Sequence, residues 1–187
     1  MKLFILATIM TIASLGMQAQ KQDPWMEYMM PSAVHEMLGR YTGNFTMEIS
    51  MWMTASQDPQ VVKVKSTNRM ILGGRFLEMT QTGKMAGMDY NAITTIGYNN
   101  SDKKIALTTI TNMGTGILSL TGSWDEKTEL VQLTGTMTNP VTKKPIRVRQ
   151  TVSFPDKDTL LIENFDQEEG AKERKSIQYR FTRALEN

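Results

Sequence analysis

Apolar and polar residues alternate along most of the chain after residue 44, and this two-residue period is typical of β-strands with one buried face. In the first such stretch Phe45, Met47, Ile49, Met51 and Met53 alternate with mostly polar neighbours, and we expect their side chains to point into the protein. Turn residues interrupt the alternation repeatedly along the chain. The pattern predicts about ten strands, at residues 45–53, 60–72, 75–82, 89–98, 104–111, 117–124, 129–138, 146–154, 159–165 and 175–182.

The connections between the predicted strands are short. Neighbouring strands are therefore antiparallel, because a parallel crossover needs about a dozen or more residues. Gly73-Gly74 is predicted to be a two-residue hairpin turn with a residue at positive φ. A sandwich of this many strands needs long Greek-key connections, whereas closure into a barrel removes the exposed sheet edges. We predict an all-β fold, a closed antiparallel up-and-down barrel with a short N-terminal helix.

The first residues are typical of a secretory signal peptide. Lys2 precedes an apolar run at residues 3–15, and small and polar residues follow it up to Ala19. The run is shorter than the roughly 20 apolar residues that cross a bilayer, so we expect no membrane span. Residues 1–19 are predicted to be cleaved off, which leaves a protein exported to the periplasm or secreted.

Two more segments precede the strands. Residues 20–31 are predicted to be a linker that carries an aromatic and methionine cluster. Ser32 is the expected N-cap of a short helix, and Gly39 ends it. The barrel domain is expected at residues 32–187.

Composition and charge narrow the classes of function. The chain has 21 Lys and Arg against 19 Asp and Glu, without a basic run, so no nucleic-acid partner is expected. It has no cysteine, so an exported chain depends on its core without a disulfide. With one histidine, a multi-histidine zinc site is excluded and a Ser-His hydrolase is not favoured. We expect neither a metal nor a cofactor.

Several strings of residues resemble a known family. They are the string at residues 71–77 (Ile-Leu-Gly-Gly-Arg-Phe-Leu), the strings at 96–99 and 112–116, and the sequence around His35 and Gly43-Asn44-Phe45. Together they resemble the uncharacterised bacterial family called domain of unknown function 1579, over about residues 31–183. Phe45 stands where that family has a tryptophan. The resemblance implies a lipocalin-like barrel with no established activity.

Two residue types suggest chemistry beyond packing. His35 lies in the predicted helix, where its ring is expected to bond a backbone group at the barrel end; an axial haem ligand is the alternative. Methionines cluster at Met26, Met29 and Met30 and recur on the first strand. Methionine fills cores and lines adaptable pockets, and Cu(I) binding is the alternative.

A ligand-binding cavity is predicted inside the barrel. Arg75 is the candidate for clamping a carboxylate, since a guanidinium matches two oxygens; a salt bridge at the barrel rim is the competing interpretation. The other candidates to line the cavity are Met47, Met51, Tyr98, Trp124 and Tyr179.

Three hypotheses about function follow from this pattern. The favoured one is an exported barrel that binds a small apolar or amphipathic molecule. The second is an enzyme of the isomerase or lyase type that uses the cavity with a lone carboxylate, such as Glu78, as base. The third is a structural or interaction protein with a filled barrel. A catalytic constellation is not evident in the sequence, and the volume of the lumen discriminates between the hypotheses.

Overall fold

The computed structural model describes residues 23–54, 57–125, 127–128 and 130–185. The predicted signal peptide at residues 1–19 lies outside the described residues. Within them, two short helices, α1 (Pro24–Met29) and α2 (Ala33–Gly39), precede ten strands. Neither helix is long and apolar enough to cross a membrane.

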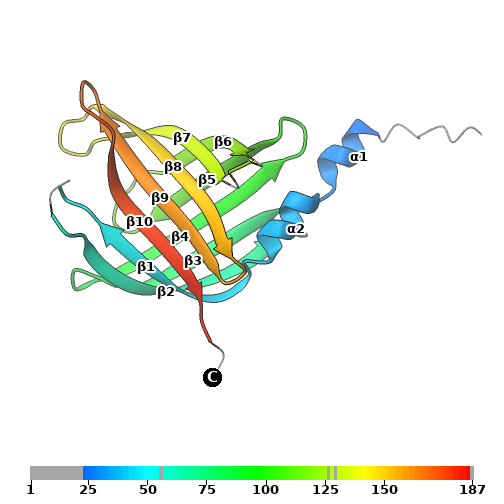
Figure 1. The fold of residues 1–187 in the computed structure, drawn as a ribbon, viewed down its shortest axis with the longest axis horizontal. Coiled ribbons are helices and arrows are strands. Elements are labelled where there is room, and N and C mark those ends of the chain that lie inside the picture. The colour runs from blue at the N-terminus through cyan, green and yellow to red at the C-terminus, as the bar shows by residue number, and fades with distance from the viewer. Residues whose placement is uncertain (1–22, 55–56, 126, 129, 186–187) are drawn as a thin grey trace, which may run out of the picture.

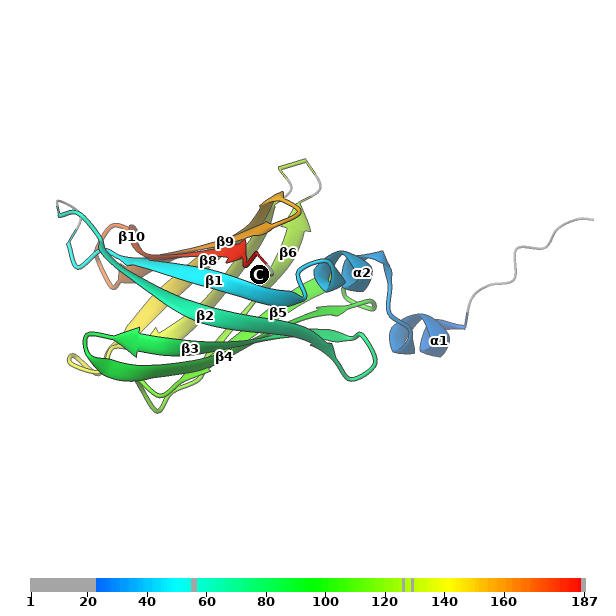
Figure 2. The same cartoon turned by 90° about the horizontal axis from the view of Figure 1, so that it is seen from below.

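The ten strands close into an antiparallel barrel, as predicted. Each strand pairs with its neighbours in the chain, and β1 also pairs with β10, which closes the ring. Figures 1 and 2 show the barrel from two perpendicular directions, with the red β10 beside the cyan β1. The strands are β1 (Gly43–Met51), β2 (Gln60–Ile71), β3 (Phe76–Met85), β4 (Met88–Asn99), β5 (Lys104–Thr111), β6 (Leu118–Asp125), β7 (Leu130–Thr138), β8 (Pro145–Asp156), β9 (Thr159–Glu168) and β10 (Arg174–Arg183).

The turns around β3 differ from the predicted ones. The β2–β3 turn has four residues rather than two: Leu72, Gly73 and Gly74 all have positive φ, and the Arg75 amide donates to the Ile71 carbonyl. The predicted positive φ at the glycines is confirmed, at 67° and 81°. β3, which was predicted to end at residue 82, continues through Gly83 to Met85. A glycine can lie inside a strand where a neighbouring side chain, here Val64 of β2, needs the space.

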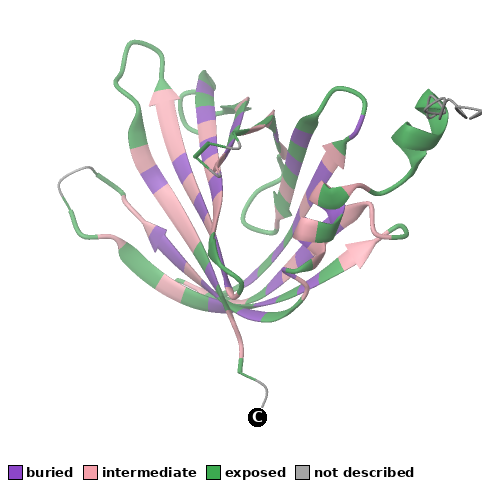
Figure 3. Ribbon diagram, turned by 45° about the vertical axis from the view of Figure 1, so that its right-hand side comes forward, coloured by how far each residue is buried: buried purple, intermediate pink, exposed green. Residues whose placement is uncertain are grey.

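Burial alternates along the strands, as the colour bands of Figure 3 show. On β1, Phe45, Met47 and Ile49 are buried in the lumen as predicted, and Met51 is half-buried. Met53 is 67% exposed, contrary to the prediction, because β1 ends at Met51 and the chain leaves the barrel there.

The helix α2 covers one end of the barrel. His35 and Leu38 are its buried residues, and the helix contacts β3 and β4. Residues 20–31 are not only a linker, because Pro24–Met29 form α1 with the Asp23 side chain accepting from the Trp25 amide. Trp25 is 68% exposed and α1 projects away from the barrel (Figure 1), so it does not plug the lumen.

Arg183, at the end of β10, ties together the chain segments where the barrel closes. Its guanidinium lies 4.7 Å from the centre of the Phe45 ring and forms an ion pair with Asp158 at 2.8 Å. It also donates to the carbonyls of Thr42 and Arg40, both at 2.7 Å. One side chain thus connects the last strand, the β8–β9 turn and the segment that joins α2 to β1.

Candidate functional site

A small cavity lies inside the barrel. Its volume is about 40 Å³, and its walls come from every strand except β2 and β7. It is lined by Met47, Gln81, Tyr90, Thr94, Leu107, Thr109, Leu118, Gln150, Ile162, Tyr179 and Phe181.

Gln81 is the most unusual residue of this wall. It sits on β3 opposite Ser66 of β2 and Ala92 of β4, in the register that turns its side chain inward. It is only 1% exposed, yet neither Oε1 nor Nε2 finds a hydrogen-bond partner among the described residues. Burying a polar group without a partner costs about 1–3 kcal/mol of folding free energy. A hydrogen-bonding molecule in the cavity would recover this cost.

Gln150 on β8 is the second such residue. It is 3% exposed, and its Nε2 donates to Asn164 Oδ1 at 3.0 Å. Asn164 Nδ2 in turn donates to Asp166 Oδ1 at 2.7 Å and to Ser176 Oγ at 2.8 Å. This chain of bonds holds Gln150 in place, while its Oε1 has no partner within the described residues.

The remaining polar groups of the wall are hydroxyls. Thr94 and Thr109 share a hydrogen bond of 3.0 Å between their Oγ1 atoms, across β4 and β5. Burial raises the pKa of Tyr90, and burial together with Tyr90 and Asp166 raises the pKa of Tyr179, so both phenols keep their protons. Every side chain that lines the cavity is therefore uncharged at neutral pH.

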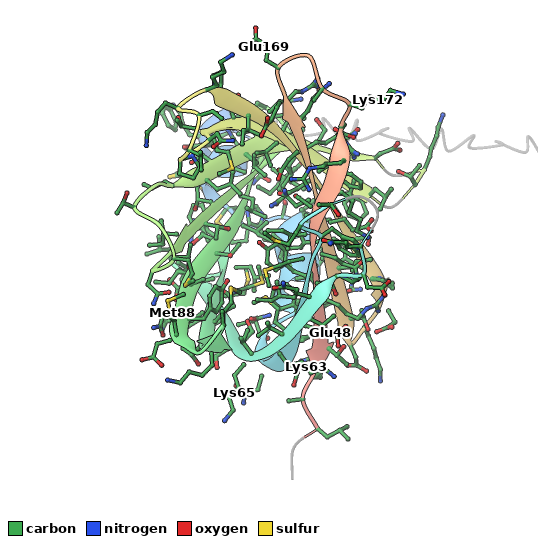
Figure 4. The ribbon with its side chains drawn as sticks, turned by 90° about the vertical axis from the view of Figure 1, so that its left-hand side faces the viewer. Glu48, Lys63, Lys65, Met88, Glu169 and Lys172 are labelled. Carbon is green, nitrogen blue, oxygen red and sulfur yellow. The ribbon has the colours of Figure 1, made fainter. Side chains whose placement is uncertain are left out.

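The charged residues of β1, β2 and β3 lie on the outer face of the barrel. In Figure 4, which faces the barrel end opposite α2, Lys63 and Lys65 of β2 point away from the lumen, and Lys63 pairs with Glu48 of β1 at 3.3 Å. Glu78 is also on the outer face, paired with Arg69 at 2.7 Å. It is therefore not placed to act as a base in the cavity, as the enzyme hypothesis required. Among the described residues, no group of three His, Asp or Glu side chains could hold a metal ion.

The structure divides the predicted site residues among three places. Met47 and Tyr179 line the lumen cavity. Arg75 and Tyr98 line a separate groove of about 580 Å³ beside α1, over the outer face of β3 to β6. Met51 and Trp124 line neither; Trp124 packs against Phe154 near the α2 end, with ring centroids 5.8 Å apart.

The prediction that Arg75 clamps a carboxylate inside the barrel is wrong. Arg75 belongs to the β2–β3 turn rather than to a strand, and its guanidinium donates to the backbone carbonyls of Leu72, Gly73 and Met29. Asn100 likewise donates to the Glu27 carbonyl at 2.8 Å. The Arg75 guanidinium and the Asn100 amide nitrogen thus fasten α1 to the barrel.

The sequence analysis missed Gln81, Gln150 and the two threonines. A signal was present: Gln81 stands two positions after Met79 and Gln150 two after Val148, so each amide occupies a core-facing position of its strand. A polar residue in phase with the apolar face predicts a buried polar group. Only the closed barrel brings these four strands around one cavity.

The fold and the cavity define the class of this protein: an up-and-down ten-stranded barrel whose lumen holds a small cavity lined by apolar and uncharged polar side chains. Residues 30–183 match the family described as "Protein of unknown function (DUF1579)", and the chain belongs to that family, which confirms the resemblance. No curated protein matches the chain. A solved "redesigned beta barrel" is similar, with a TM-score of 0.44 and 5% identity over 79% of this chain and 95% of that one.

Proposed function

We propose that this protein is an exported barrel that binds one small, uncharged, amphipathic molecule in its lumen. The observation that carries the proposal is the pair of buried glutamines, Gln81 and Gln150. Both line one cavity, and together they have three amide atoms without a hydrogen-bond partner among the described residues. A ligand that hydrogen-bonds to these atoms recovers the free energy lost in burying them, about 1–3 kcal/mol for each group.

The rest of the wall supports an amphipathic ligand. Met47, Leu107, Ile162 and Phe181 give the cavity an apolar part, and methionine adjusts its shape to a guest. The absence of charge on the lining residues favours a neutral ligand, because an unpaired charge is costly to bury.

The size of the cavity limits the ligand. Pockets for drug-sized molecules have volumes of about 300–1,000 Å³, whereas one water needs about 10–15 Å³. A cavity of about 40 Å³ therefore suits a ligand of a few non-hydrogen atoms, unless side chains move to enlarge it. A drug-sized molecule does not fit these walls.

Export is part of the proposal and is supported by the N-terminal sequence, with Lys2 before the apolar run at residues 3–15. Cleavage after Ala19 gives a protein that begins at Gln20.

Native mass spectrometry of protein purified from its own host tests both parts. We expect a chain that begins at or near Gln20, carrying one small adduct that is lost on denaturation. Leu118→Phe fills the cavity from β6 and should abolish the adduct, whereas Ser119→Phe, on the exposed face of the same strand, should keep it. A folded wild type without an adduct contradicts the binding function, and a chain that retains residues 1–19 contradicts export.

A further inference from the structure

We infer that the ligand carries a primary carboxamide, whose two N–H groups and one carbonyl match the three unpartnered atoms of Gln81 and Gln150. This inference rests on the proposed lumen-binding function and specifies the ligand's chemical class. The inference follows from the donor or acceptor character of the three glutamine atoms that have no partner among the described residues.

Gln81 offers one donor group and one acceptor. Its Nε2 and Oε1 lie side by side in one plane, and neither has a partner in the part of the chain that the structure describes. Another amide complements such an edge with two parallel hydrogen bonds, its N–H donating to Oε1 and its carbonyl accepting from Nε2. A ketone can form only the second of these bonds, and an alcohol has no such planar pair of groups.

Gln150 offers an acceptor only, and Asp166 determines this. An ionised carboxylate accepts hydrogen bonds and cannot donate, so Asn164 must turn its Nδ2 toward Asp166. The Oδ1 of Asn164 then faces Gln150, whose Nε2 donates to it at 3.0 Å. The free atom of Gln150 is consequently Oε1, which needs a donor from the ligand.

A ligand that satisfies both glutamines therefore needs two hydrogen-bond donors and one acceptor. A primary carboxamide has both N–H groups and a carbonyl on one carbon, whereas a lactam or secondary amide has one N–H and leaves Gln150 unpartnered. A carboxylate brings a charge and no donor into a wall without a cation. The apolar tail of the amide would lie against Met47 and Phe181.

Isobutyramide and methyl isopropyl ketone test the inference, because they have the same shape and differ only in an amino group against a methyl group. Titrations followed by NMR of the methionine methyl groups give the dissociation constants. We expect the wild type to bind the amide about tenfold or more tightly than the ketone, as the added hydrogen bonds require. Isobutyrate, the charged analogue, should bind more weakly than the amide.

Gln81→Met and Gln150→Met replace each amide by an apolar side chain of similar length, and each should reduce the preference for the amide. Gln81→Met should fold, since removing a buried amide that has no partner among the described residues relieves a cost. Gln150→Met also removes the donor to Asn164 Oδ1 and should therefore be less stable, so a circular dichroism spectrum is used to check that it is folded before the titration. Gln132→Met, on the exposed face of β7, is the matched control and should keep the wild-type preference.

Equal binding of amide and ketone to the wild type overturns the carboxamide inference and leaves lumen binding in place. A preference that survives in both lumen variants overturns the assignment to these glutamines. Binding of neither compound also overturns the inference, and lumen binding is then decided by the native mass measurement alone.

Discussion

At the scale of single residues, His35 illustrates how burial changes the proton affinity of a side chain. Its Nδ1 accepts a hydrogen bond from the Ser32 amide at 2.9 Å and lies 3.0 Å from Ser32 Oγ. Ser32 and His35 together form a capping box at the start of α2. Burial, and to a lesser degree the Arg75 charge, lowers the pKa of His35, although a hydrogen bond to the Tyr98 backbone opposes this. These contacts match the predicted role of a helix residue bonded to the barrel end.

The lowered pKa of His35 predicts a dependence of stability on pH. The unfolded chain, with the ordinary value of 6.5, takes up a proton before the folded protein does. The free energy of unfolding should therefore be highest above about pH 6.5 and decrease as the pH falls below it. Urea unfolding at pH 7.5 and pH 5.5 measures this.

The chain has one histidine, so His35→Gln should remove most of the change within this interval. An equal decrease in the variant would assign the effect to other groups, and equal stability at both pH values in the wild type would contradict the lowered pKa.

At the scale of elements, the β2–β3 turn depends on backbone conformation more than on contacts. Gly74 has φ of 81°, and a Cβ at this position would meet no atom within 4 Å. The cost of a side chain there comes only from the left-handed backbone region, which L-residues other than Asn and Asp rarely adopt.

Gly74→Val should therefore destabilise the protein by about 1–2 kcal/mol. Gly114→Val is the matched control: a Cβ at this glycine of the β5–β6 loop also meets no atom within 4 Å, and its φ is not in the left-handed region. The control should change the free energy of unfolding by less than about 0.5 kcal/mol. Equal losses in thermal or urea unfolding would show that the turn conformation is not the cause.

At the scale of the whole molecule, the barrel closes where its first and last strands pair, from Phe45 opposite Arg183 to Met51 opposite Ile177. This seam joins residues more than a hundred positions apart, so its formation has the largest loop-closure cost of the sheet. Arg183 reinforces it with contacts to Phe45, Asp158 and two backbone carbonyls. Gly43 allows this arrangement, since it has φ of 110° and a Cβ would lie 3.2 Å from the Arg183 guanidinium.

Arg183→Met should cost about 2–4 kcal/mol, because it leaves partly buried carbonyls without their charged donor. Arg180→Met, an exposed position on the same strand, should cost less than about 0.5 kcal/mol. Urea unfolding compares the two. A similar small loss in both variants would mean that β1–β10 pairing alone holds the seam.

The candidate site was only partly predictable. Met47 and Tyr179 were identified because an apolar or aromatic residue at a core-facing position lines whatever lumen exists. The Gly-Gly pair predicts a two-residue turn, which would place Arg75 on a strand. In the structure Leu72 also has positive φ, so the turn is longer and includes Arg75. Which buried atoms lack partners depends on packing between strands distant in the chain, and Gln81 and Gln150 show this.

The sequence by itself determined the strand order, the antiparallel pairing and the side chains that face inward, because a two-residue period and short turns are local properties of the chain. The tertiary structure decided the size and the lining of the lumen cavity, which is small and has apolar and uncharged polar walls. The physical reason is that cavity volume and hydrogen-bond satisfaction depend on the closed ring of all ten strands. Hydrogen bonds from Gln150 through Asn164 to Asp166 join β8 and β9, and closure of the ring brings Gln150 and Gln81 of β3 to one cavity.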